Sequence, residues 1–309
     1  MLATLALTLP IFALIAAGFA WGRWRDLGEE AVALLNGYVV WLALPVLLFE
    51  FVAGSAGEAF TGAGRFTLVF GGGMALTFAA GIIAGGRGRP LADRAVDALA
   101  AAYSNTAYLG IPLMTALLGP AGTAAAVIAS LMTVSLLFAF GVLLVEADLR
   151  RGPGLGRAAG GVALAVLRNP LVAAPLAGVA WALTGIALPA PVASFAQFLA
   201  QSASPVALVT IGVFLSIRRR PATGPLLGRV LALKLAGQPL LTAALLLAVP
   251  LPPLWAPAAI LLAALPTGTG PFMVAQLYGR DVALAARVIL LTTLIGLASV
   301  SLLAWWIVR

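Results

Sequence analysis

The sequence predicts an all-α integral membrane protein of ten transmembrane helices, arranged as two inverted five-helix repeats, and three observations carry this prediction. Of the 309 residues, 62% are hydrophobic and only 9% are charged, whereas soluble domains have about 25% charged residues. Ten apolar segments reach the length of about 20 residues that a spanning helix needs. Proline and glycine motifs of the first half also recur in the second half in the same order.

The ten predicted helices are residues 2–22, 31–53, 65–86, 96–118, 121–146, 169–187, 192–217, 225–249, 253–278 and 282–308. The first segment could be mistaken for a secretory signal. It lacks a basic region before its apolar stretch and is followed by many further segments, so we expect it to be retained as a helix.

Arginine is unevenly distributed between the loops. The odd-numbered loops hold thirteen arginines, from Arg23 to Arg280, and the even-numbered loops hold only Arg65. Because arginine and lysine near short loops mark the cytoplasmic side, both termini are expected on the non-cytoplasmic side. We therefore attribute the net charge of +8 to arginines that set the membrane topology, and we expect no nucleic-acid partner.

The internal repeat divides the chain. Pro10 and Trp21 recur as Pro170 and Trp181, and Pro45 recurs as Pro205. We expect a first repeat over residues 1–147, a cytoplasmic linker over 148–168 and a second repeat over 169–309. Five helices per repeat reverse the direction of the second repeat, as in many transporters. The alternative is that prolines and glycines, which are frequent in membrane helices, coincide by chance.

The fourth and ninth predicted helices are each interrupted by polar residues, glycine and proline: SNTAYLGIPLM at 104–114 and LPTGTGPFM at 265–273. Proline removes a backbone donor and clashes with the preceding turn, while glycine accepts conformations that other residues resist. Paired breaks in corresponding helices indicate a binding site near the membrane midplane. The candidate substrate-binding residues are Asn105, Thr106, Gly110, Ile111, Pro112, Pro266, Thr267, Gly268, Thr269, Gly270 and Pro271.

A broken helix presents the N-terminus of its second half, whose free N–H groups attract anions. Two such ends meeting at the midplane would hold a carboxylate. The alternative is a pair of proline kinks whose backbone groups are satisfied by neighbouring helices.

The eighth predicted helix carries Lys234, Gln238 and Thr242 on one face, four residues apart. Lysine deep in a bilayer is a functional candidate by default. Lys234 and Gln238 are therefore expected to supply charge support along a substrate path. The alternative is that the lysine extends to the cytoplasmic surface near Arg229.

Residue types also limit the chemistry. The chain has no cysteine and no histidine, so we expect no metal site and no cofactor. It also lacks the HExxH and GxSxG motifs of hydrolases, which leaves a Ser/Lys dyad at Lys234 as the one enzymatic alternative.

Motifs along nearly the whole chain carry a resemblance to a known family. They are LNGY at 35–38, LPVLLF at 44–49, 105–112, 169–170, 204–212, Lys234 with Pro239, and 266–281. In this order and spacing they resemble the auxin efflux carrier family, which includes the plant PIN-FORMED exporters and bacterial malonate or malate permeases.

The resemblance implies a fold like that of sodium/proton antiporters and bile-acid symporters, in which helices 4 and 9 cross at their prolines. It also implies a scaffold of helices 1, 2, 6 and 7 and a moving transport domain of helices 3–5 and 8–10. In the family the substrate carboxylate binds an asparagine that corresponds to Asn105. Helix 9 departs from the plant pattern because Thr267 and Thr269 stand at its break.

We therefore expect a carrier in the lipid bilayer of the bacterial inner (plasma) membrane, which moves a small organic anion by elevator-type alternating access. The expected substrates are auxin-like compounds or dicarboxylates, and the resemblance suggests a homodimer through the scaffold helices. A sodium-coupled organic anion symporter and a channel remain the alternatives.

Overall fold

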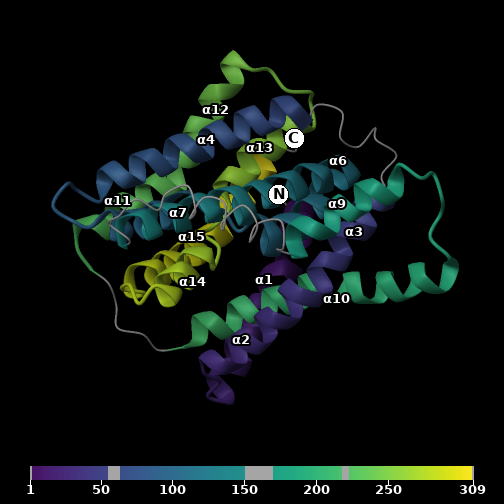
Figure 1. The fold of residues 1–309 in the computed structure, drawn as a ribbon, viewed down its shortest axis with the longest axis horizontal. Helices are drawn as coiled ribbons and strands as arrows, with labels where there is room; N and C mark the ends of the chain where they lie inside the picture. The colour runs from purple at the N-terminus through teal and green to yellow at the C-terminus, as the bar shows by residue number, and fades with distance from the viewer. Residues whose placement is uncertain (1, 55–62, 150–169, 218–222, 308–309) are drawn as a thin grey trace.

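The computed structural model describes residues 2–54, 63–149, 170–217 and 223–307 (Figure 1). Within these ranges the regular structure is helical and no strand is present, so the prediction of an all-α protein is confirmed there. The predicted linker lies outside the described residues from residue 150 to its end.

The chain forms α-helices joined in places by turns of π-helix. The α-helices are α1 (Leu2–Trp24), α2 (Glu29–Tyr38), α3 (Leu44–Gly54), α4 (Ala63–Ala84), α5 (Leu91–Ala102), α6 (Ile111–Leu131), α7 (Phe138–Leu149), α9 (Pro170–Ala182), α10 (Ala190–Ser216), α11 (Pro225–Ala232), α12 (Gln238–Ala248), α13 (Trp255–Ala264), α14 (Gly270–Leu277) and α15 (Ala283–Ile307). The π-helical turns are η1 (Val39–Ala43), η3 (Thr106–Gly110), η4 (Met132–Leu137) and η5 (Leu233–Gly237).

Six continuous helical stretches among the described residues are long and apolar enough to cross a membrane. They are Glu29–Gly54, Ala63–Ala84, Thr106–Leu149, Ala190–Ser216, Pro225–Ala248 and Ala283–Trp306. Large apolar side chains face outward on several helices: Trp24 is 84% exposed and Leu247 is 88% exposed. Extensive exposed apolar surface of this kind is typical of a protein surrounded by lipid.

Three of the four π-helical turns in the described ranges end two residues before a proline. η1 precedes Pro45, η3 precedes Pro112 and η5 precedes Pro239. Proline has no backbone N–H to donate, and its ring clashes with the carbonyl four residues earlier. A wider π turn moves that carbonyl away, so each helix continues past its proline.

The long stretch Thr106–Leu149 folds back on itself at Gly119. Gly119 has φ of 61° and ψ of −147°, a left-handed φ that glycine adopts readily, and Pro120 follows it. On either side, the hydroxyls of Thr115 and Thr123 lie 2.8 Å apart. Residues eight positions apart in a straight helix are separated by about 12 Å. The chain therefore reverses between the predicted helices 4 and 5.

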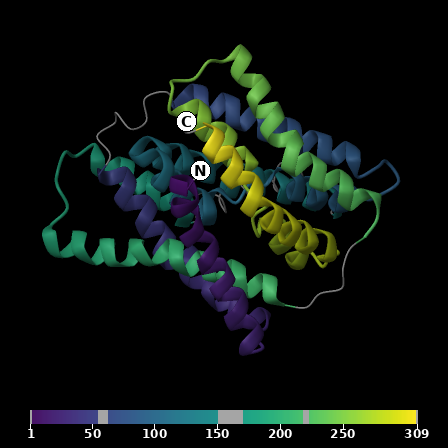
Figure 2. The same ribbon diagram turned by 180° about the vertical axis from the view of Figure 1, so that it is seen from behind.

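The helices pack in two groups. α1 lies along α10, and α3 packs against α9 and α10; these helices occupy one part of the molecule in both views (Figures 1 and 2). In the other part, α4 packs on α5 and α12, and α13 contacts α6 and α12. The division of these helices into a scaffold and a transport domain stays a prediction.

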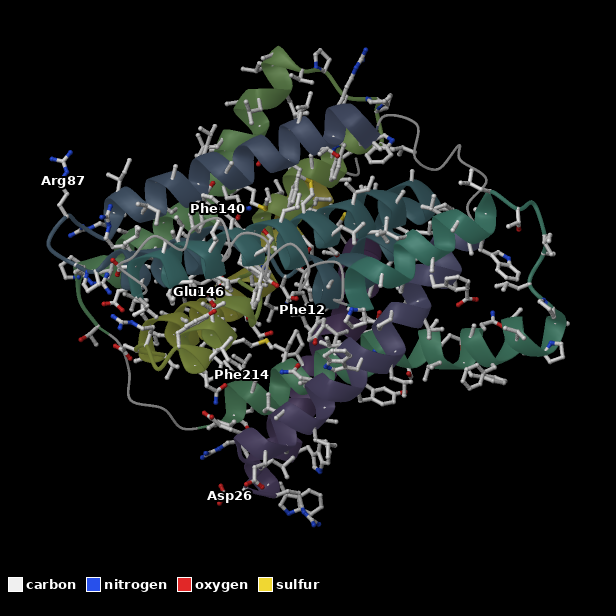
Figure 3. All side chains as sticks on the ribbon, in the orientation of Figure 1. Phe12, Asp26, Arg87, Phe140, Glu146 and Phe214 are labelled. Carbon is white, nitrogen blue, oxygen red and sulfur yellow. The ribbon has the colours of Figure 1, made fainter. Side chains whose placement is uncertain are left out.

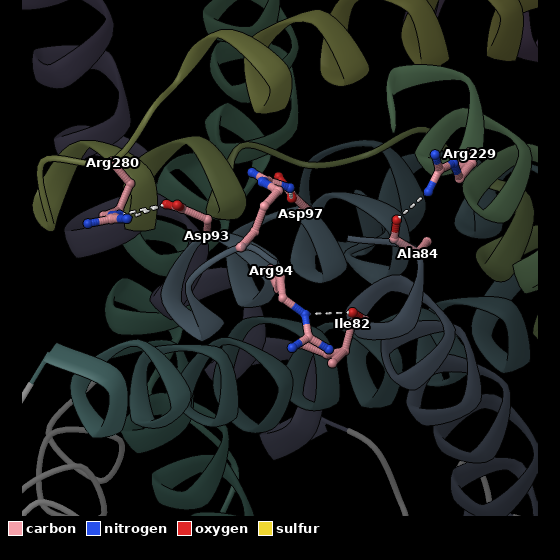
Figure 4. A network of polar contacts seen from close by, with 8 residues as sticks. Ile82, Ala84, Asp93, Arg94, Asp97, Arg229 and Arg280 are labelled. Carbon is pink, nitrogen blue, oxygen red and sulfur yellow. Dashed lines mark hydrogen bonds and ion pairs between the residues drawn. The ribbon is translucent and has the colours of Figure 1, made fainter. Parts of the chain in front are cut away.

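Two of the arginine-rich loops, those that follow α4 and α14, meet at one end of the molecule, around the start of α5. The contacts are Arg280 Nε to Asp93 Oδ1 at 2.7 Å, Arg94 Nε to Ile82 O at 2.9 Å and Arg229 Nη1 to Ala84 O at 2.8 Å, with Arg89 paired to Asp97 (Figure 4). At the same end, Tyr278 donates its hydroxyl to Glu146 at 2.8 Å, whereas Arg87 projects outward beyond α4 (Figure 3). Segments predicted to share one side of the membrane therefore contact one another.

Candidate functional site

The two interrupted helices meet at their breaks. Between α5 and η3 the chain leaves helical geometry at Tyr103, and between α13 and α14 it does so at Leu265. Ser104 and Thr267 form an isolated antiparallel bridge. The Asn105 N–H donates to Pro266 O at 2.8 Å, and the Gly268 N–H donates to Tyr103 O at 2.9 Å. We call the segments 103–105 and 265–269, with this bridge, the helix junction.

The bridge explains how non-helical backbone is tolerated deep in an apolar protein. A buried N–H or C=O without a partner is costly, and at the helix junction each break supplies partners for the other. Thr267 adds two more bonds: its N–H donates to Thr292 Oγ1 at 3.1 Å and its hydroxyl donates to Ala100 O at 2.8 Å. The breaks are therefore a paired structure and not two separate kinks.

Neighbouring side chains leave little room for a Cβ at the glycines of the break before α14. A Cβ at Gly270 would lie 2.5 Å from Cζ of Tyr103, and a Cβ at Gly268 would lie 3.1 Å from the same ring. Gly110, Gly268 and Gly270 are not among the positive-φ glycines of the chain. The expected reason for these glycines, conformational freedom, is therefore wrong. Close approach of the Tyr103 ring takes its place at Gly268 and Gly270, and close approach of leucine side chains takes its place at Gly110.

A cavity of about 120 Å³ lies beside the helix junction, where the second halves of both broken helices begin. Its walls are Val40, Tyr103, Ser104, Asn105, Thr106, Ala107, Tyr108, Val134, Phe138, Gly268, Thr269, Gly270 and Met273. None of these residues carries a charged side chain, and both η3 and α14 start at this wall. Their N-terminal N–H groups and partial positive charges are suited to an anion.

Two polar side chains that are adjacent in the chain stand in this wall. Thr106 is fully buried, and its hydroxyl has no hydrogen-bond partner. Asn105 is 8% exposed and lines the same cavity. Buried polar atoms nearly always have partners, so the Thr106 hydroxyl, with the Asn105 amide next to it in the chain, indicates a ligand position.

The remaining predicted binding residues lie outside the cavity wall. Gly110 packs against Leu262 and Leu265, and Thr267 is committed to the bonds described above. Pro271 occupies the second position of α14, where a missing N–H costs nothing, and Pro112 follows the wide turn η3, which accommodates it. These residues shape the breaks, while Asn105, Thr106, Gly268, Thr269 and Gly270 face the cavity.

Lys234 and Gln238 lie on the other side of the helix junction, where α5 and α13 end. Both side chains are fully buried, so Lys234 does not extend to the surface. Its Nζ donates to Ser104 Oγ at 2.6 Å, to Ala263 O at 3.0 Å and to Gln238 Oε1. Gln238 Nε2 donates to Ala102 O at 3.0 Å. The pair therefore caps the C-terminal ends of both first halves.

A second cavity, of about 270 Å³, adjoins the first and shares Val40, Thr269 and Met273 with it. It runs between α2 and α14 as far as Glu29 and Gln276, whose side chains are hydrogen-bonded at 3.1 Å. Glu29 begins α2, next to the loop that carries Arg23 and Arg25. The two cavities together reach from the helix junction toward one of the arginine-rich loops.

Sequence reasoning did not single out several residues of the wall. Tyr103 and Tyr108 lie within the interrupted stretch, and Val40, Phe138 and Met273 come from neighbouring elements. Their residue types are those of any apolar core. The tyrosines carried the one usable signal, since a buried tyrosine needs a partner for its hydroxyl: Tyr108 donates to Asn36 Oδ1 at 3.3 Å.

Comparison with known proteins gives two matches. A sequence model of the family described as "Membrane transport protein" matches residues 4–151 and 158–305. A protein of Rhizobium meliloti (strain 1021) named "Putative malonate transporter" is 35% identical over 314 residues, which cover 96% of this chain and 93% of that protein.

Proposed function

The chain belongs to the membrane transport protein family, the family of the auxin efflux carriers, and on that premise we propose that it carries small dicarboxylates such as malonate. As a member of this family it is a multi-pass membrane transporter and not an enzyme. The named relative supports malonate as the first substrate to test.

One observation carries the proposal: the buried, unpartnered Thr106 hydroxyl lies beside two half-helix N-termini in a cavity wall without charged side chains. A carboxylate placed there would accept from the Thr106 hydroxyl, the Asn105 amide and the free N–H groups of η3 and α14. Hydrogen bonds to a charged acceptor contribute about 1.5–3 kcal/mol each. The geometry therefore favours an anion over a neutral solute of similar size.

Transport is proposed to occur by alternating access. α1–α3, η1, α9 and α10 would form the scaffold, and α4–α7 with α11–α15 would form the transport domain. Asn105, Thr106 and α14 all belong to the moving group, whereas Val40 and Asn36 belong to the scaffold, so movement between the groups would carry the anion away from the second cavity. That cavity would be the path toward the cytoplasm.

The membrane arrangement follows from the same proposal. Ten crossings as two inverted repeats would place both termini outside the cytoplasm and the arginine-rich loops inside, in the bacterial inner membrane. The contacts among those loops support a common side. A homodimer would form through the scaffold helices.

Counterflow in proteoliposomes tests the proposal. Vesicles loaded with unlabelled malonate are diluted into labelled malonate, and we expect saturable accumulation of label that malate and succinate inhibit but neutral malonamide does not. Asn105→Ala should abolish accumulation, while Ser130→Ala, which alters a buried hydroxyl bonded only within its own helix, should not. Absence of counterflow, or equal inhibition by malonamide, would reject an organic anion carrier, and non-saturable flux would indicate a channel.

A further inference from the structure

The asparagine of the LNGY motif at residues 35–38 connects the two cavities. Asn36, in α2, lines the second cavity. Tyr108, in η3, lines the first cavity and donates its hydroxyl to Asn36 Oδ1 at 3.3 Å. Thr106 stands two residues before Tyr108 in the same turn. The Asn36 amide is therefore joined, through Tyr108, to the wall that holds the proposed carboxylate position.

The bond to Tyr108 determines which part of the Asn36 amide a ligand can use. An asparagine amide has one acceptor oxygen and two donor N–H groups. Tyr108 holds the oxygen, so the N–H groups are the part available to a ligand in the second cavity. A carboxylate can accept hydrogen bonds from these donors, whereas a methyl group cannot.

Thr269 offers a second donor at the boundary between the cavities. It lines both cavities and stands at the N-cap of α14, yet its side chain makes no capping hydrogen bond. An N-cap threonine usually has extended backbone and accepts a hydrogen bond from the second or third helical N–H. Thr269 instead has φ of −76° and ψ of −11°, which is helical backbone. Its hydroxyl is therefore not used to cap the start of its own helix.

Negative charge lies at the far end of the second cavity. Among the described residues that line the two cavities, Glu29 alone has a charged side chain, and it accepts a hydrogen bond from Gln276 at 3.1 Å. Asn36 lies seven residues further along α2, about 10 Å away along the helix axis. The Debye length at physiological salt is about 8 Å, so Glu29 repels an anion at Asn36 only weakly.

We propose that Asn36 is a specificity-determining residue of the carrier: its amide, together with the Thr269 hydroxyl, receives the second carboxylate of a dicarboxylate whose first carboxylate lies at Thr106. Tyr108 is a positioning residue, because it holds the amide oxygen away from that second carboxylate. This role rests on the proposed function and deepens it, since the site then selects acids with two carboxylates over acids with one.

Binding of two matched acids tests the role of Asn36. Malonate and propionate have the same number of carbon atoms and differ in one carboxylate, and each is titrated calorimetrically into purified protein at neutral pH. We expect wild type to bind malonate about tenfold more tightly than propionate. Asn36→Leu should keep the propionate affinity of wild type and bind the two acids within about twofold of each other. Tyr108→Phe should lower the preference about threefold, because the amide can then turn.

Two control variants separate this role from a general effect on the protein. Tyr38→Phe alters a hydroxyl of the same helix, which lies 2.6 Å from Ser202 Oγ, and Tyr38 lines neither cavity. Both affinities should stay at the wild-type values in this variant. Thr106→Val should weaken both acids by a similar factor and leave the preference unchanged, since each acid places a carboxylate at Thr106.

The outcomes distinguish the role of Asn36 from the proposed function. A wild-type preference within about twofold, or a preference that Asn36→Leu retains, overturns the role of Asn36 and leaves the anion site at Thr106 intact. Failure of wild type to bind either acid rejects the proposed function, and the role of Asn36 with it.

If Asn36→Leu cannot be purified, Asn36→Asp decides. The aspartate keeps an oxygen for the Tyr108 hydroxyl and replaces the two donors by a negative charge, so malonate should be weakened at least about tenfold more than propionate. Equal weakening of the two acids would overturn the role of Asn36.

Discussion

The two sides of the helix junction differ in how fully their polar atoms are paired. On the side where α5 and α13 end, Lys234, Gln238 and the Ala102 and Ala263 carbonyls are joined by hydrogen bonds. On the side where η3 and α14 begin, the Thr106 hydroxyl has no partner. Pairing stabilises a fold, and a buried unpaired group indicates a role beyond stability. The first side is therefore structural, and the second is proposed to bind the anion.

The largest expected effect is on stability from the paired side. Gln238→Leu removes the side-chain bond to the Ala102 carbonyl, which keeps the Ser104 N–H at 3.1 Å, and it removes one acceptor from the Lys234 ammonium. We therefore expect a loss of about 3 kcal/mol in the free energy of unfolding. Denaturant titration in detergent measures it. The control Thr242→Val should lose about 1 kcal/mol or less, and equal losses in the two variants would show that the paired side has no special role.

The next effect concerns the packing that lets the breaks meet. Gly270→Ala places a methyl group against the Tyr103 ring, and overpacking of this kind costs roughly 1–3 kcal/mol. The double variant Gly270→Ala/Tyr103→Leu should recover part of that loss in thermal unfolding. Gly228→Ala, where nothing lies within 4 Å of the new Cβ, is the control. Additive losses in the double variant would contradict the contact.

A matched pair of threonines sharpens the comparison between the two sides. Thr106→Val removes the unpartnered hydroxyl, so we expect unchanged stability and about tenfold weaker malonate binding. Thr267→Val removes the bond to Ala100 O, so we expect a stability loss of about 1 kcal/mol and little change in affinity. Thermal unfolding and calorimetric titration measure both. The reverse pattern would exchange the roles assigned to the two hydroxyls.

The smallest effect is expected at the outer end of the second cavity. Gln276→Leu removes the hydrogen bond to Glu29, but Gln276 is exposed and water replaces the bond. Malonate counterflow should change by no more than about twofold, the effect of a surface contact below 0.5 kcal/mol. A tenfold change in rate would place a gate at this contact.

The positions of the two breaks could be predicted from the sequence because proline, glycine and polar residues interrupt otherwise apolar runs. The shared face of Lys234, Gln238 and Thr242 could also be predicted, since helical spacing fixes it, but its burial could not. Neither the interruptions nor the helical spacing shows which other helices pack against these residues. That Lys234 points into the helix junction, and that Gly270 is small because of Tyr103, depends on contacts between residues far apart in the sequence.

The apolar residues of the first cavity's wall show the same limit of sequence-based prediction. Phe138 and Met273 look like ordinary core residues in the sequence, and only packing places them at the cavity. The ten crossings and the inverted repeat rest on the sequence pattern and the family resemblance, and they stay predictions.

One measurement tests most directly whether the side of the helix junction where η3 and α14 begin binds the anion. It is calorimetric titration of purified wild type and Asn105→Ala with malonate in sodium-free buffer. The account predicts binding by wild type without sodium, and binding weakened about 10- to 100-fold in Asn105→Ala at an unchanged unfolding temperature. Equal affinities in the two proteins, or binding that appears only after sodium is added, would contradict it.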